Sequence, residues 1–291
     1  METHTLPVPG ATLTYDVRGD LGPGVRPLVL IGSPMDASGF GTLATYFTDR
    51  TVVTYDPRNT GRSERDDPTA PVTAAQHADD LRALLDALGS EPVDLFASSG
   101  GAVNALWLVA SHPDAVATLV AHEPPLAALL PDREAIAAVT ADMVATYEAR
   151  GQGPAMAKFI TLVMYRGVVP PTYLDQPEPD PAHFGLPTED DGSRDDPMMT
   201  NMRGGGTDEL PDLDAVAAAP TRVLVAVGEE SATSTTDGEL AGRAAYAVAE
   251  RLGRDPVVFP SHHAGFLGGE FGQTGDPERF APRLREVLSE A

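Results

Sequence analysis

Residues 92–103 read Pro-Val-Asp-Leu-Phe-Ala-Ser-Ser-Gly-Gly-Ala-Val, a pattern that predicts a buried strand followed at once by a helix. The strand is predicted by its apolar residues, Val93, Leu95 and Phe96. A turn this sharp leaves one residue in a strained backbone conformation beside the free N–H groups of the new helix. Small residues two positions before and after it prevent a collision, and this pattern centres on Ser99, between Ala97 and Gly101.

Strands and helices alternate at both ends of the chain, and a long stretch between them interrupts the alternation. The predicted strands cover residues 3–8, 11–18, 28–31, 51–55, 93–96, 117–122, 221–227 and 256–259. The predicted helices cover residues 38–48, 73–88, 100–110, 126–150, 154–165, 238–252 and 276–290. This order implies an α/β fold, with a mostly parallel sheet covered by helices on both faces.

The interrupted stretch divides the predicted domains. Residues 1–123 and 221–291 form the predicted core. Residues 124–220, which we call the cap segment, contain predicted helices but no predicted strand. Within it, residues 167–211 are rich in Pro, Asp and Gly and predict no clear element. We therefore expect one core with a helical insertion over one edge of the sheet.

The composition excludes several classes of function. The chain of 291 residues has no cysteine, which rules out disulfides, thiolate catalysis and cysteine-ligated metals. It carries 43 acidic and 20 basic residues, a net charge of −23 that repels phosphate backbones and anionic lipids. Neither a signal peptide nor a long apolar run is present. We expect a soluble cytoplasmic protein that acts on a small molecule and binds neither nucleic acid nor membrane.

Chemically useful side chains follow the predicted strands. In an open parallel sheet, ligands bind beyond the carboxyl ends of the strands. The residues found there are Gly32-Ser33-Pro34, Ser99, His122-Glu123, Gly228-Glu229-Glu230 and Ser261-His262-His263. A serine hydroxyl becomes a strong nucleophile when a neutral imidazole takes its proton and a carboxylate orients that imidazole. The chain offers serine, carboxylate and histidine in that order.

These motifs resemble those of the α/β-hydrolase superfamily. The window around Ser99 is similar to its nucleophile elbow, with Ala97 in place of the usual first Gly. Asp-Pro-Arg-Asn-Thr-Gly-Arg-Ser at 56–63 is similar to its Asp-x-Arg-Gly-x-Gly-x-Ser loop. The resemblance covers residues 3–122 and 221–290. It implies an α/β-hydrolase fold with an eight-stranded sheet and a helical cap.

The resemblance also assigns roles to particular residues. Ser99 is the expected nucleophile and His263 the expected base, with His262 as the alternative. The backbone N–H groups of Ser33 and Gly100 are the expected oxyanion donors. The His that usually precedes the Gly of the first loop is absent, which leaves the backbone donor itself in place.

Two carboxylates compete for the role of the acid. Most members of the superfamily carry Asp after the penultimate strand, at the position that Ser231 occupies here. Other branches place the acid after the strand that follows the nucleophile helix, where this chain has Glu123. Its His-Glu-x-Pro context is similar to serine lactonases of the zearalenone-hydrolysing type. We expect Glu123 to be the acid, with Glu230 as the alternative.

Neither a metal nor a cofactor is expected. A metal site would gather His122, Glu123, His262 and His263, but no metal-binding spacing is present, and no glycine-rich nucleotide loop follows a strand. The other histidines fall on predicted surface or loop positions and are left outside the site: His4, His77, His112 and His183.

Methionines are concentrated in the cap segment, which carries six of the eight. Together with nearby aromatic residues they are predicted to line an apolar pocket above Ser99: Met143, Met156, Met164, Met198, Met199, Met202, Phe159, Tyr165, Tyr173 and Phe184. We therefore expect a serine hydrolase that cleaves an ester or lactone of a largely apolar small molecule through an acyl-enzyme. The alternatives are a non-hydrolytic enzyme on the same fold (a lyase, cyclase or perhydrolase) and an inactive small-molecule-binding homologue.

Overall fold

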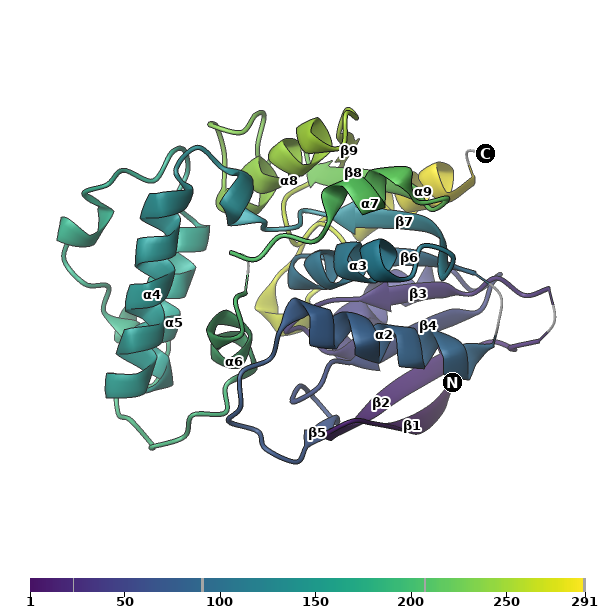
Figure 1. The fold of residues 1–291 in the computed structure, drawn as a ribbon, viewed down its shortest axis with the longest axis horizontal. Helices are drawn as coiled ribbons and strands as arrows, with labels where there is room; N and C mark the ends of the chain where they lie inside the picture. The colour runs from purple at the N-terminus through teal and green to yellow at the C-terminus, as the bar shows by residue number, and fades with distance from the viewer. Residues whose placement is uncertain (23, 90–91, 207, 290–291) are drawn as a thin grey trace.

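A single sheet with helices on both faces forms the centre of the computed structural model, which describes residues 1–22, 24–89, 92–206 and 208–289 (Figure 1). Eight strands follow the order β1-β2-β4-β3-β6-β7-β8-β9, and a short β5 pairs with β2. Their bounds are β1 Glu2–Val8, β2 Ala11–Arg18, β3 Leu28–Ile31, β4 Val52–Asp56, β5 Glu64–Arg65, β6 Val93–Ser98, β7 Val116–His122, β8 Arg222–Gly228 and β9 Val257–Phe259. The strands from β4 to β9 along this order pair in parallel, and β2 is antiparallel to each of its neighbours. The predicted α/β fold is confirmed.

Successive residues of the buried strands point to opposite faces of the sheet. In β3, Leu28 and Leu30 pack on the side of α1 and α9, while Val29 and Ile31 pack on the side of α2, α3, α7 and α8. These helices are α1 Gly41–Thr45, α2 Ala74–Leu88, α3 Gly100–Ser111, α7 Leu213–Ala218, α8 Leu240–Arg251 and α9 Pro277–Ser289. Because helices cover both faces, the strand is apolar at every position. Residue 290, the predicted end of the last helix, lies outside the described residues.

The cap segment supplies three helices beside the carboxyl ends of the parallel strands, α4 Arg133–Arg150, α5 Gln152–Val163 and α6 Pro197–Arg203. α4 and α5 lie against each other at one end of the molecule (Figure 1). The predicted helix 126–150 is interrupted, because Pro131 favours an extended conformation at Leu130 (φ −81°, ψ 152°). α7 belongs to the same range of sequence, yet its Leu213 joins the core cluster of the sheet. The division into core and cap stays a prediction.

Within the described part of the chain, no helix combines the length and the apolarity needed to cross a membrane.

A buried ion pair ties the start of α4 to α8. Arg243 is fully buried, and its guanidinium lies 2.6 Å from an Asp132 carboxylate oxygen. Asp132 also accepts the N–H of Val169. The pair therefore connects α8 to two points of the cap segment.

Replacing Arg243 by Leu is expected to lower the free energy of unfolding by about 3–5 kcal/mol, because Asp132 is left buried without a countercharge. Urea denaturation measures this loss. Arg251→Leu on the same helix is the matched control, since its pair with Asp214 is exposed and contributes less than about 1 kcal/mol. Equal losses in the two variants would contradict a stabilising role for the buried pair.

Candidate active site

Ser99 occupies the sharp turn between β6 and α3. Its backbone has φ 58° and ψ −129°, a region that costs a non-glycine residue about 1–3 kcal/mol. Three hydrogen bonds hold this conformation: the Ser99 N–H donates to the His122 carbonyl (2.9 Å), and the Ser99 carbonyl accepts from the N–H groups of Ala102 (2.9 Å) and Val103 (3.3 Å). The strained turn predicted from the sequence is present, and it places Ser99 at the N-terminus of a helix.

The loop after β3 packs directly onto this helix N-terminus. A Cβ on Gly100 would stand 2.6 Å from the Ser33 carbonyl oxygen, and one on Gly101 would stand 2.8 Å from the Gly32 Cα. Only glycine permits backbones to approach so closely. The two predicted oxyanion donors, Ser33 and Gly100, are thus neighbours.

His263 and Glu123 form a short hydrogen bond across the strand ends. His263 Nδ1 lies 2.5 Å from Glu123 Oε2. Glu123 is fully buried, and its other oxygen accepts the Gly228 N–H at 2.8 Å. Glu230, the alternative acid, is exposed, and the described contacts of His263 do not include it. The structure therefore brings Glu123 to His263.

Burial and the pair itself set the charges of these two groups. Burial raises the pKa of Glu123, but the hydrogen bond from His263 and its charge outweigh this and lower that pKa to about 2. Burial lowers the pKa of His263, but Glu123 outweighs that effect and raises it above its ordinary value. Because Nδ1 faces the carboxylate, Nε2 is the ring nitrogen free to exchange a proton. His262, the alternative base, accepts the Ala264 N–H at its Nδ1 (3.1 Å).

His122 lies behind the pair as a neutral ring. Its centroid is 5.9 Å from that of His263, with 24° between the ring planes. Burial lowers the pKa of His122 to about 4. Its Nδ1 lies 3.0 Å from the Ser98 hydroxyl oxygen. His122 therefore packs beside the site without adding positive charge.

A cavity of about 910 Å³ lies between these residues and the cap segment. Ser33, Ser99, Gly100 and His263 all line it. The apolar lining from the cap segment includes Met143, Met156, Met164, Met198, Met202 and Phe159, as predicted. Four predicted residues do not line it: Met199, Tyr165 and Tyr173 pack within the cap segment, and Phe184 is exposed. Residues outside the cap segment complete the lining, and the sequence did not predict them; among them are Met35, Phe266 and Phe271.

The prediction that His77 is a surface or loop residue is wrong. Only 3% of His77 is exposed, and it lines the cavity from the first turn of α2. Its Nε2 lies 3.0 Å from Asn201 Oδ1, so α6 covers a histidine that the isolated helix would expose. The Thr73 hydroxyl caps α2 by accepting the Gln76 N–H, a local contact that predicts where the helix begins but not that His77 is buried.

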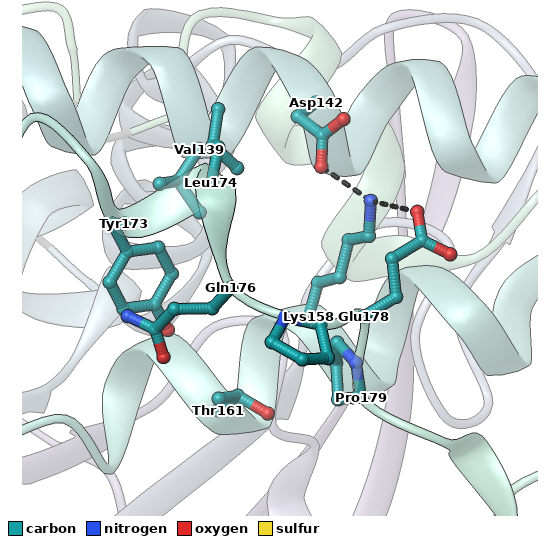
Figure 2. A pocket seen from close by; sticks show the side chains of 10 residues that line it. Val139, Asp142, Lys158, Thr161, Tyr173, Leu174, Gln176, Glu178 and Pro179 are labelled. Atoms are coloured by element: carbon teal, nitrogen blue, oxygen red, sulfur yellow. Dashed lines mark hydrogen bonds and ion pairs between the residues drawn. The ribbon is translucent and has the colours of Figure 1, made fainter.

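A second, smaller cavity of about 120 Å³ lies within the cap segment (Figure 2). Lys158, the only lysine of the chain, reaches into it between Asp142 (2.5 Å) and Glu178 (3.1 Å). Two carboxylates thus neutralise the ammonium group. This cavity offers no net positive charge to a ligand.

Comparisons with known proteins agree with the fold. A family model described as the alpha/beta hydrolase fold matches residues 36–165, which include Ser99 and Glu123. Over 133 residues, the chain is 39% identical to the uncharacterized hydrolase YraK of Bacillus subtilis (strain 168), a match to 45% of this chain and 47% of that protein. The chain thus matches about half the length of this curated relative.

Solved structures match over almost the whole chain at low identity. The enol-lactonase from Burkholderia xenovorans LB400 has a TM-score of 0.67 and 18% identity, over 99% of this chain and all of that one. A thermophilic esterase from Thermogutta terrifontis has a TM-score of 0.68 and 20% identity, over 99% and 98% of the two chains. These similarities show a shared fold.

Proposed function

Because the chain belongs to the α/β-hydrolase superfamily, we propose that it is a serine hydrolase that cleaves an ester or lactone of a largely apolar small molecule. One observation carries the proposal: Ser99 and His263 line the same apolar cavity, and Glu123 is hydrogen-bonded behind His263. The strained turn at Ser99 and the low pKa of Glu123 support it further.

In the proposed reaction, His263 Nε2 takes the proton from the Ser99 hydroxyl as the oxygen bonds to the carbonyl carbon of the substrate. The carbonyl oxygen becomes an oxyanion, which the N–H groups of Ser33 and Gly100 bind. When the tetrahedral intermediate collapses, the C–O bond to the alcohol breaks and the alcohol takes the proton from His263. Water then repeats the sequence on the acyl-enzyme, releasing the acid and restoring Ser99.

The lining of the cavity supports an uncharged, apolar substrate. Neither Lys nor Arg is among the described residues that line it, and the one carboxylate, Glu239, lies 3.2 Å from Arg166. An anionic substrate would therefore lose hydration without gaining a countercharge. A volume of about 910 Å³ is near the upper end for small-molecule sites. The names enol-lactonase and esterase of two proteins with this fold agree with ester or lactone chemistry.

A panel of chromogenic esters and lactones, assayed with and without a serine-directed phosphonate, tests the proposal. We expect acid release that the phosphonate abolishes, with a higher kcat/KM for long neutral acyl groups than for acetyl or for a carboxylate-bearing acyl group of equal length. Phosphonate labelling without turnover of any ester or lactone would favour a non-hydrolytic enzyme. Absence of both would favour a binding protein.

The pH dependence of kcat/KM is expected to show one acidic limb, with an apparent pKa above 6.5, because His263 must be neutral to accept the serine proton and Glu123 raises its pKa. Activity is therefore lost as the pH falls through this value. Glu123 stays ionised across the range, since its pKa is about 2. Initial rates between pH 5 and pH 9, at substrate concentrations well below KM, measure the limb. A limb near pH 4.5, typical of an unperturbed carboxyl group, would contradict His263 as the base.

A further inference from the structure

Three polar side chains form a hydrogen-bonded row along one wall of the large cavity. His77 lies on α2, Asn201 on α6 and Ser33 in the loop after β3. His77 Nε2 is 3.0 Å from Asn201 Oδ1, and Asn201 Nδ2 donates to the Ser33 hydroxyl oxygen over 3.3 Å. The row thus connects the cap segment to the loop that carries a proposed oxyanion donor.

The partners of Asn201 determine where each proton of the row lies. Since Asn201 Nδ2 donates to Ser33, Asn201 Oδ1 is the acceptor for His77, which carries its proton on Nε2. Burial lowers the pKa of His77 and so favours the neutral ring that this arrangement requires. Asn201 occupies a lone pair of the Ser33 hydroxyl. Among the described residues, no hydrogen bond uses the proton of that hydroxyl.

The Ser33 side chain lies beside the helix that follows the nucleophile. Its Cβ is 3.4 Å from the point where a Cβ on Gly100 would stand. Ser33 is 7% exposed, and it lines the cavity. Its hydroxyl is therefore close to the N-terminus of α3, where the positive end of the helix dipole favours a developing negative charge.

We propose that Ser33 is a catalytic residue, because its hydroxyl is a third hydrogen-bond donor to the oxyanion, in addition to the backbone N–H groups of Ser33 and Gly100. Asn201 is a positioning residue, which occupies the lone pair of the hydroxyl and leaves its proton for the substrate. His77 in turn orients Asn201. The inference rests on the proposed function, because the oxyanion forms only when Ser99 attacks a carbonyl. The Ser33 hydroxyl keeps its proton throughout and donates a hydrogen bond.

Ser33→Ala tests the donor directly. We expect kcat to fall by about 10- to 100-fold with KM changed less than about threefold, because the hydrogen bond acts on charge that exists only in the transition state. Ser33→Thr keeps the hydroxyl and is expected to restore most of kcat. Ser38→Ala is the matched control, because Ser38 is an exposed serine in the short 3-10 helix after this loop (Ala37–Phe40) and its hydroxyl donates to Asp36. It should match the wild type.

A trifluoromethyl ketone analogue of the best ester gives a second readout, because its serine adduct carries an oxyanion. Ser33→Ala should weaken inhibition by this ketone by the same factor by which it lowers kcat. Inhibition by the corresponding alcohol, which forms no adduct, should not change. A purely structural role for Ser33 would weaken both inhibitors or neither.

Asn201→Leu tests the link to the cap segment. Leucine has a similar volume but cannot bond Ser33 or His77, so kcat should fall by a factor between threefold and that of Ser33→Ala. In the Ser33→Ala background the same change should lower kcat less than about twofold, since its effect passes through the hydroxyl. Asn201→Asp should lower kcat at least as much as Asn201→Leu, because a carboxylate accepts the Ser33 proton and repels the oxyanion.

If Ser33→Ala kept the wild-type kcat and the wild-type inhibition by the ketone, the proposal that the Ser33 hydroxyl is a third oxyanion donor would be wrong. Full additivity of the Ser33 and Asn201 changes would overturn the positioning role. Failure of the proposed function itself has a different signature, since Ser99→Ala would then keep its activity whatever the Ser33 variants do.

Discussion

Ser99→Ala is expected to lower kcat for a chromogenic ester by about 10⁵- to 10⁶-fold, the loss typical of removing a serine nucleophile. The reason is local. Ser99 is the residue that the strained turn between β6 and α3 exposes to the cavity, and His263 lines the same cavity. A fluorophosphonate followed by intact-mass measurement should label the wild type once and leave Ser99→Ala unlabelled.

Ser98 provides the control for this assignment, because it is the neighbouring serine on the same turn. It also lines the cavity, but its hydroxyl lies 3.0 Å from His122 Nδ1. Ser98→Ala should therefore keep the fluorophosphonate label on Ser99. If Ser98→Ala lost the label and Ser99→Ala kept it, the nucleophile would be Ser98 and the proposed arrangement would be wrong.

Much of the fold could be predicted because burial on both faces leaves a simple pattern. A strand such as Leu28–Ile31 is apolar at every position, and a turn that must admit a close backbone approach needs glycine, as at Gly101. The conformation of the loop after β4 also agrees with its sequence motif. Asn59 adopts a φ of 62°, and Arg62 pairs with Asp56 at 2.7 Å. Each of these features depends on neighbours close in sequence or on a repeating pattern.

The row from His77 to Ser33 could not be predicted, because it depends on a contact between residues 124 positions apart. His77 lies on the same helix face as Ala74, Ala78 and Leu81. From the sequence, a polar side chain at that position could equally be hydrated or hydrogen-bonded to another part of the chain. The partner, Asn201, lies on a helix of seven residues, too short to show a periodic pattern. Its one local signal is Asp196 before Pro197, an N-cap followed by proline in the first turn.

The choice between two acids needs the same kind of distant contact. Glu123 and Glu230 both follow a strand, and sequence alone leaves the alternative open. What distinguishes them is how the sheet positions His263, 140 residues after Glu123. Ser231, at the position where most members of the superfamily carry the acid, is fully buried, and among the described residues its hydroxyl has no hydrogen-bond partner. That position supplies no carboxylate, so Glu123 is the acid that we propose.

Glu123→Gln is expected to lower kcat by about 10³- to 10⁴-fold, because it reverses the tautomer of His263. The Gly228 N–H donates to Glu123 Oε1 at 2.8 Å, so a glutamine would keep its carbonyl oxygen there and turn its NH₂ group toward His263 Nδ1. Nδ1 would then have to accept a hydrogen bond, leaving the proton on Nε2, which could no longer take one from Ser99. Loss of the carboxylate should also move the acidic limb of kcat/KM to lower pH.

Glu230→Gln is the matched control, since Glu230 is exposed and the substitution is the same. It should change kcat by less than about threefold, in line with the weak effect of exposed charges. Equal urea midpoints for the two variants would show that any difference is in the chemistry and not in folding. If Glu230→Gln abolished most of kcat and Glu123→Gln did not, the hydrogen bond between Glu123 and His263 would have only a structural role. The acid would then have to reach His263 from the turn after β8.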